Sequence, residues 1–280
     1  MVLERLPMHT LPSSQVDRVL NHLHLKPEAP TRDALDRILV AWSERIPWES
    51  MSRIARHQRH GTPEDYARFP DAYFDHAVKQ GTGGTCFESN LALRALLNTL
   101  GYSVSLAFCD MEKSDPNPHC TVIVQLEEAH YLADVGYPVA GALLLDDQQT
   151  TQIETPVYTY WATPTANARW DIHRTSGDYR SLSFVVKGEP IPEADFIQRL
   201  IRDHQPDGLF LHNAIVARTI GGVMLRYSED RGLVKRSHEI GEVTVELTES
   251  QQASLPAYLA TLFQMDEEVL RTALYRPSKA

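Results

Sequence analysis

The stretch Gly81-Thr82-Gly83-Gly84-Thr85-Cys86-Phe87-Glu88-Ser89-Asn90 passes from flexible glycines into a helix, with a cysteine at the junction. Thr85 and Glu88 have the spacing of a capping box, so Thr85 is the expected N-cap. Leucines at helical intervals follow, and Gly101 ends the pattern. Cys86 is therefore expected in the first helical turn, where unpaired N–H groups favour a thiolate and could hold an oxyanion. The open alternative is a buried structural cysteine.

Composition restricts the class of protein and its partners. The chain has 280 residues, enough for a large core and about two domains. Its net charge of −10 opposes binding to nucleic acid and to anionic membranes, although a local basic pocket could still take a small anionic cofactor. Three cysteines are too few for a disulfide framework and lack the ligand spacing of a zinc site, so we expect no metal. No signal peptide or membrane-spanning segment is evident, and we expect a cytoplasmic protein.

The pattern of apolar residues predicts an α+β fold in three regions. Residues 1–102 read as a helical bundle that carries the cysteine, and residues 103–190 read as an antiparallel sheet or small barrel. Pro190-Ile191-Pro192 is the expected linker to residues 191–280, an α/β region. The expected helices lie at 13–25, 31–44, 71–79, 193–204, 250–263 and 266–274. The expected strands lie at 103–108, 119–126, 131–135, 157–160, 181–186, 213–219, 223–227 and 243–247.

A cysteine nucleophile needs a base, and the base usually needs an acid that orients it. Among the 12 histidines, His119 begins a strand, and a hairpin about Leu126-Glu127 would place it opposite Asp134, within hydrogen-bonding reach. A turn one residue longer would instead pair His119 with Gly136 and leave Asp134 diagonal. Cys86, His119 and Asp134 therefore form a candidate catalytic triad. The alternatives are a strand-end histidine bonded to backbone and an aspartate that initiates a turn.

These motifs resemble those of the arylamine N-acetyltransferases, and the resemblance covers nearly the whole chain. The similar segments are Gly83-Gly84-Thr85-Cys86-Phe87-Glu88, Pro118-His119, Tyr131-Leu132-Ala133-Asp134-Val135-Gly136-Tyr137, Ile46-Pro47-Trp48-Glu49-Ser50-Met51, the strand at 210–218 and the ending near Leu262-Phe263. The resemblance implies a helical bundle with the cysteine, a β-barrel with the histidine and aspartate, and a C-terminal α/β lid, around a core like that of cysteine proteases.

The resemblance also implies a reaction. An acetyl group would pass from acetyl-coenzyme A, through a thioester on Cys86, to the nitrogen of an arylamine, hydroxylamine or hydrazine in a ping-pong sequence. His119 would take the thiol proton and later the proton of the amine. No metal or tightly bound cofactor is needed. Residues beside the triad would contact the substrates, namely Phe87, Asn117, Pro118 and Tyr137.

Three departures from the family pattern leave the acceptor and the acyl donor open. Thr82 stands where the family usually has an arginine before its two glycines, so Glu49 is expected to have a different partner. Ser50 replaces an asparagine, and Gly136-Tyr137-Pro138 replaces the family's Gly-Phe-Gly.

The nearest alternative is an amide synthase that takes a longer acyl chain from a carrier protein. A cysteine hydrolase and a non-catalytic interaction domain of the same fold are further alternatives. Two basic clusters are expected to be solvated surface rather than phosphate sites. The first comprises Arg53, Arg56, His57, Arg59 and His60, and the second comprises Lys235, Arg236 and His238.

Overall fold

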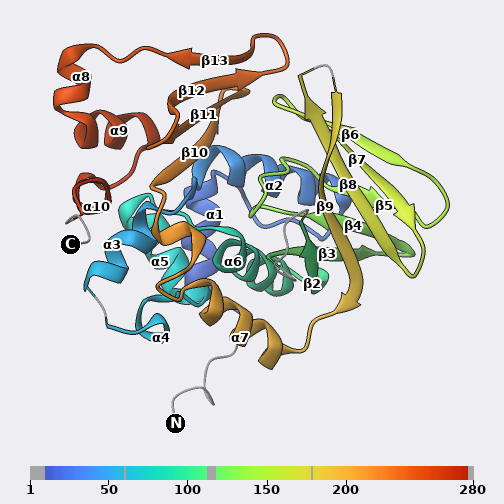
Figure 1. Ribbon diagram of the computed structural model, residues 1–280. Coiled ribbons are helices and arrows are strands. Elements are labelled where there is room, and N and C mark those ends of the chain that lie inside the picture. Colours follow the sequence, from blue (N-terminus) through green and yellow to red (C-terminus); the bar gives the residue numbers. More distant parts are fainter. Residues whose placement is uncertain (1–9, 60, 112–117, 178, 277–280) are drawn as a thin grey trace.

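The computed structural model describes residues 10–59, 61–111, 118–177 and 179–276. Helices of the N-terminal part lie at the centre, an antiparallel barrel lies on one side, and a smaller sheet with its own helices lies above (Figure 1). This arrangement confirms the predicted α+β class. The N-terminal helices are α1 (Ser13–Leu23), α2 (Arg32–Arg45), α3 (Met51–Arg59), α4 (Pro63–Tyr66), α5 (Pro70–Gln80) and α6 (Cys86–Thr99).

Helix α6 is the central element of the N-terminal part. Its residues from Cys86 to Leu93 are all buried, so the helix lacks the polar face of a surface helix. It packs against α5 on one side and against strands of the barrel on the other. A helix enclosed in this way holds the cysteine at its first position in a fixed place.

The barrel consists of eight antiparallel strands in the order β5-β4-β3-β2-β9-β8-β7-β6. It is nearly closed, because β5 at one end packs against β6 and β7 at the other. The strands are β2 (Ser103–Asp110), β3 (His119–Leu126), β4 (Ala129–Ala133), β5 (Leu143–Leu145), β6 (Thr151–Glu154), β7 (Thr159–Thr165), β8 (Arg169–Ser176) and β9 (Tyr179–Pro190). Strands β5, β6 and β8 were not among the predicted strands. Strands β5 and β6 are too short to show a clear apolar alternation, and in β8 only Trp170 and Ile172 alternate with polar residues.

The C-terminal sheet begins with a strand from the N-terminal part. Its order is β1-β10-β11-β12-β13, and β1 (Trp48–Glu49) pairs with β10, so the first and last predicted regions share one sheet. The other elements are α7 (Glu193–Asp203), η1 (Leu209–Leu211), β10 (Ile215–Ile220), β11 (Val223–Ser228), β12 (Gly232–Ser237), β13 (Gly241–Val245), α8 (Glu249–Ala253), α9 (Leu255–Phe263) and α10 (Glu267–Leu274).

Two predictions for this part need correction. Strand β12 was not predicted, and the single helix expected at 250–263 is two helices, because the chain leaves helical geometry at Ser254. Pro256 then occupies the first turn of α9, a position that proline favours. No helix among the described residues has the length and apolar character needed to cross a membrane.

Candidate active site

Cys86 is the first residue of α6, as the sequence predicted, and its side chain is buried. The capping prediction is wrong in part. Thr85 is the N-cap in its extended backbone, but its side chain makes no capping bond. Its hydroxyl instead accepts a hydrogen bond from Arg53, and the Glu88 carboxylate binds other arginines. The backbone N–H groups of the first turn, where Cys86 lies, therefore have no side-chain cap.

His119 and Asp134 form a buried pair, with 2.6 Å between Nε2 and Oδ2. The favoured register was wrong. Leu126 pairs with Ala129 around a two-residue turn, so the His119 position is diagonal to Asp134, as in the alternative register. The contact still forms, because Asp134 lies just beyond the last paired residue of β4, where the backbone can turn its side chain toward β3.

The orientation of Asp134 is fixed by three donors to its other carboxylate oxygen. Oδ1 accepts from the N–H groups of Gly136 (2.9 Å) and Tyr137 (2.8 Å) and from Nδ2 of Asn90 (3.0 Å). Oδ2 is therefore left for the imidazole of His119. Hydrogen bonds of this kind to a buried carboxylate stabilise its charged form and restrict its rotation.

Asn90 connects the cysteine helix to the barrel, and the sequence analysis assigned it no role. Besides Asp134, its Nδ2 binds the carbonyl of Cys120 at 2.7 Å, and its Oδ1 accepts from the N–H of Val135 at 3.1 Å. The available signal was its spacing. Asn90 follows Cys86 by four residues, so both lie on one face of α6.

The backbone of Gly136 lies directly against Cys86. A Cβ at Gly136 would stand 2.7 Å from Cβ of Cys86, closer than side chains pack, so this approach requires a glycine. The Cys86 Sγ lies 4.0 Å from the carbonyl oxygen of Pro118, the residue before His119. The strand that carries the base and the loop that carries the acid therefore enclose the sulfur between them.

His119 is poised to be charged beside the sulfur. Burial alone would lower its pKa, but the Asp134 carboxylate and the Cys86 sulfur together raise the pKa of His119 to about 10. Because Nε2 faces Asp134, the other ring nitrogen, Nδ1, remains for the cysteine. A protonated imidazole held in this way can stabilise a thiolate as an ion pair.

The environments of the other two cysteines disfavour a thiolate. Cys109 and Cys120 are fully buried, and burial together with nearby negative groups raises the pKa of each thiol well above its ordinary value. All three cysteines are free. Among the described residues, no group of three or more His, Cys, Asp or Glu side chains is placed to hold a metal ion.

The residues expected to contact substrate have different surroundings. Tyr137 is half-buried, with its ring 6.1 Å from the ring of His119. Pro118 is half-buried beside Cys86. Phe87 lies in the core between α6 and α7, where its ring packs against Phe196 at 5.7 Å, so it borders no open space. Asn117 lies outside the described residues.

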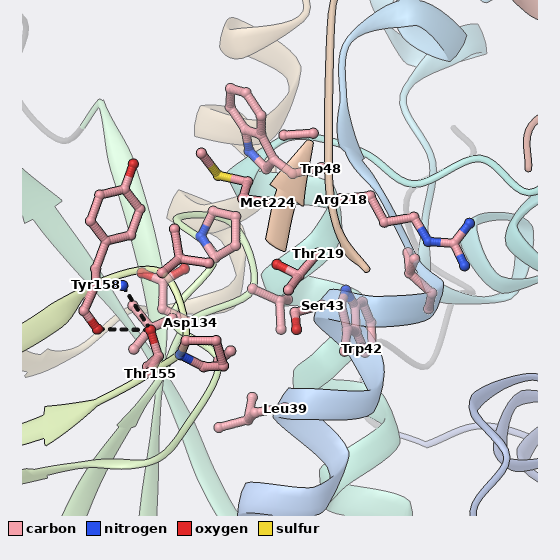
Figure 2. A pocket seen from close by; sticks show the side chains of 18 residues that line it. Leu39, Trp42, Ser43, Trp48, Asp134, Thr155, Tyr158, Arg218, Thr219 and Met224 are labelled. Carbon is pink, nitrogen blue, oxygen red and sulfur yellow. Dashed lines mark hydrogen bonds between the residues drawn. The ribbon is translucent and has the colours of Figure 1, made fainter. Parts of the chain in front are cut away.

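A pocket opens beside Asp134, where α2, the loop after β4 and the C-terminal sheet meet (Figure 2). It is narrow, with a cavity volume of about 30 Å³. Its walls are mainly apolar and aromatic, with Trp48, Tyr158 and Met224 among the lining side chains. Cys86 does not line it, so Asp134 and the neighbouring Val135 form the wall between the pocket and the cysteine. Apolar lining with few polar groups is typical of small-molecule sites.

The prediction of a solvated face is wrong for two arginines of the first basic cluster and right for Arg59, which is exposed; His57 is half-buried, and His60 lies outside the described residues. Arg53 and Arg56 are buried, and Arg56 with Arg68 binds the fully buried Glu88, with N–O distances of 2.9 and 2.7 Å. Burial would raise the pKa of Glu88, but the two guanidinium groups hold it well below its ordinary value. In the second cluster Lys235 and His238 are exposed as expected, whereas Arg236 is largely buried.

Arg68 reaches Thr82, the residue that stands where the family pattern has an arginine. It donates to Oγ1 of Thr82 at 3.3 Å and to the carbonyl of Gly83. Glu49 accepts from the N–H and hydroxyl of Ser52 and from the N–H of Gly83, so hydrogen-bond donors of α3 and of the glycine loop take the place of that arginine.

Comparison with known proteins supports the same fold. The model of a family described as N-acetyltransferase matches residues 31–269. No curated protein sequence matches the chain. The arylamine N-acetyltransferase of Salmonella typhimurium superposes with a TM-score of 0.77 at 19% identity, over 95% of this chain and 99% of that one. The Mycobacterium marinum enzyme in complex with CoA has a TM-score of 0.77 at 18% identity, over 92% and 98% of the two chains.

A third solved structure is described with a glutamate as the acidic residue of its triad. The arylamine N-acetyltransferase from Bacillus cereus, described with a Cys-His-Glu triad, superposes with a TM-score of 0.73 at 14% identity, over 91% of this chain and 100% of that one. This chain has the aspartate Asp134 bonded to its histidine. Because the family model spans most of the sequence, the chain belongs to the arylamine N-acetyltransferase family, whose members are acyltransferases.

Proposed function

We propose that the protein transfers an acetyl group from acetyl-coenzyme A to the nitrogen of an arylamine, hydroxylamine or hydrazine, by way of a thioester on Cys86. The observation that carries the proposal is the buried His119–Asp134 pair beside a cysteine at a helix N-terminus. The family match and the relative that binds CoA support the choice of donor. We place the reaction in the cytoplasm, where a reducing environment keeps Cys86 as a thiol.

Before the first half-reaction the proton of the Cys86 thiol passes to Nδ1 of His119, which leaves a thiolate beside the imidazolium. The thiolate attacks the thioester carbonyl, and backbone N–H groups at the start of α6 stabilise the oxyanion. The bond to the coenzyme A sulfur then breaks, and that sulfur takes the proton from His119. The products are acetyl-Cys86 and free coenzyme A.

In the second half-reaction the amine attacks the acetyl group on Cys86. His119 accepts a proton from the amine nitrogen and returns it to the departing sulfur of Cys86. Asp134 holds the imidazole in one orientation throughout. Tyr137, whose ring lies beside that of His119, is the surface that we assign to the acceptor ring.

Intact-mass analysis tests the proposal directly. After mixing with acetyl-coenzyme A, the protein should gain one acetyl group, and the gain should disappear when an arylamine is added. Cys86→Ala should abolish the gain, whereas Cys109→Ala, a matched change at another buried cysteine, should preserve it. An acetylated Cys86→Ala protein, or no acylation of Cys86 by any thioester, would contradict the proposal.

The amide synthase is the second candidate, and the apolar lining of the pocket favours it. That enzyme would accept an acyl chain longer than acetyl from a carrier protein. A mass gain with a medium-length acyl thioester, and none with acetyl-coenzyme A, would select this candidate in the same experiment.

A further inference from the structure

Arg174 is half-buried on the inner face of the barrel. It stands directly opposite Tyr160 in the β7–β8 ladder, and side chains opposite one another point to the same face of a sheet. Tyr160 belongs to the buried core of the barrel, as does Ile172, two residues before Arg174 on the same strand. The sequence pattern therefore places a permanent cation among apolar residues.

The surroundings of Arg174 are aromatic and uncharged. Its guanidinium carbon lies 4.8 Å from the ring centre of Tyr137 and 4.7 Å from that of Tyr158. Within the described part of the chain, no carboxylate forms an ion pair with it. Stacking on aromatic rings compensates part of the cost of removing a guanidinium from water, but a buried cation is stabilised most by an anion.

A second arginine approaches the same ring from the C-terminal sheet. Arg236 on β12 lies 4.6 Å from the ring centre of Tyr158, and its Nε is buried without a hydrogen-bond partner. One described carboxylate approaches it, that of Glu242, at 3.8 Å. Arg236 pairs in the sheet with Met224, which lines the pocket beside Asp134, as does Tyr158. Both guanidinium groups thus lie against the Tyr158 ring, which lines that pocket, in a chain whose net charge is −10.

We propose that Arg174 and Arg236 form an anion subsite that holds a carboxylate or phosphate group of a substrate while the reaction takes place at Cys86. The inference rests on the proposed acyl transfer and names a property of its substrates. Guanidinium groups bind these two anions with paired hydrogen bonds, which an uncharged analogue of the substrate cannot form as strongly.

The position of Arg174 favours a carboxylate on the acceptor amine. The centre of the Tyr137 ring lies 6.1 Å from that of the His119 ring and 4.8 Å from the guanidinium carbon of Arg174. The guanidinium carbon therefore lies no farther from the centre of the His119 ring than the sum of these two distances. A benzene ring with an amine at one end and a carboxylate at the other spans such a gap. The phosphates of coenzyme A are separated from its sulfur by a much longer arm.

The test compares matched acceptors. Steady-state rates are measured with 4-aminobenzoate and with its neutral amide, 4-aminobenzamide, for the wild type, Arg174→Gln, Arg174→Lys and Arg236→Gln. We expect Arg174→Gln to lower kcat/KM for the acid by about tenfold or more relative to the amide. Arg174→Lys should lose less because it keeps the charge. Arg180→Gln is the control, because Arg180 stacks on Trp161 at 5.0 Å in an exposed part of the same barrel.

A second arm identifies the source of the anion. Rates with acetyl-coenzyme A are compared with rates from S-acetyl-N-acetylcysteamine, a donor without phosphates. A loss confined to acetyl-coenzyme A would support the subsite and assign it to a phosphate of the donor. The anion subsite is refuted if the variants change neither the ratio of rates for acid and amide acceptors nor the ratio for the two donors. It is also refuted if they slow charged and neutral substrates equally, and the two arginines then only support the fold.

A binding measurement separates this inference from the proposed function. The thermal unfolding temperature is recorded with 4-aminobenzoate or 4-aminobenzamide, without any acyl donor. Stabilisation by the acid that is lost in both Arg174→Gln and Arg236→Gln supports the subsite even if the protein transfers no acetyl group. Equal stabilisation of all variants by the acid would refute it even if acetyl transfer is found.

Discussion

Replacing Asp134 by asparagine tests the catalytic pair with little change of shape. The asparagine Oδ1 can still accept from the N–H groups of Gly136 and Tyr137, so the turn after β4 should be preserved. Its amide group, however, then faces Nε2 of His119 as a donor. The neutral imidazole must accept there, and its single proton moves to Nδ1, the nitrogen that should receive the proton of Cys86.

The magnitude follows from the charge state of His119. With the carboxylate present, the pKa of His119 is about 10, so the ring is almost fully protonated beside the sulfur at pH 7.5. Without the carboxylate, burial still lowers this pKa and the Cys86 sulfur still raises it, so it should fall toward the ordinary value of 6.5. A group with that pKa is protonated in about one molecule in ten at pH 7.5. The thiolate–imidazolium pair should therefore become about tenfold rarer.

The assay is the rate of Cys86 alkylation by iodoacetamide between pH 6 and pH 10, followed by mass spectrometry. We expect the Asp134→Asn protein to react about tenfold more slowly than the wild type at pH 7.5, with its pH profile moved to higher pH. Asp146→Asn is the control, because Asp146 also accepts two backbone N–H groups in a loop of the barrel. An Asp134→Asn protein with the wild-type rate and profile would refute the role of the pair.

Two further predictions follow from the buried groups. In the wild type, iodoacetamide should label Cys86 and leave Cys109 and Cys120 unmodified, because burial raises the pKa of both; peptide mapping that finds equal labelling would contradict this. Glu88→Gln should cost about 3–5 kcal/mol in the free energy of unfolding, because two buried arginines lose their carboxylate. Because the folded protein lowers the pKa of Glu88, the ionised carboxylate stabilises the fold fully at any pH above the ordinary pKa of a glutamate. This stabilisation is lost as the pH falls through the lowered pKa. Denaturant unfolding should show the same difference in unfolding free energy between the wild type and Glu88→Gln from pH 8 to pH 5. A difference that disappears within that range would be evidence against the ion pairs.

The sequence predicted the parts of the site that depend on local pattern. The Thr85–Glu88 spacing and the leucines that follow placed Cys86 at a helix start, and it is the first residue of α6, although the side-chain cap itself is absent. The His119–Asp134 contact was predicted from two neighbouring strands, but in the wrong register. Register depends on which two residues form the turn, and Glu127 with Glu128 forms it in place of Leu126 with Glu127. Glu127 adopts the left-handed conformation needed there without a glycine in the sequence to indicate it.

The parts that were missed depend on partners far apart in the chain. Arg56 looked like a solvated cation because its local sequence is basic, yet its carboxylate partner, Glu88, lies 32 residues later. The same carboxylate was assigned to a capping box, since nothing local shows that arginines will reach it first. In the sequence Arg174 is an ordinary polar residue of a strand, and its position on the inner face follows only from the closure of the barrel.

One turn of α6 explains why these distant groups matter for the proposed chemistry. Cys86 faces the base, Glu88 binds arginines of the N-terminal part and His204 after α7, and Asn90 binds the loop of Asp134. These three side chains leave the helix within five residues, so the helix cannot shift toward the barrel without breaking contacts on its other side. The buried ion pairs thus fix the distance between the sulfur and the imidazole, and a small displacement between reacting groups can cost about two orders of magnitude in rate.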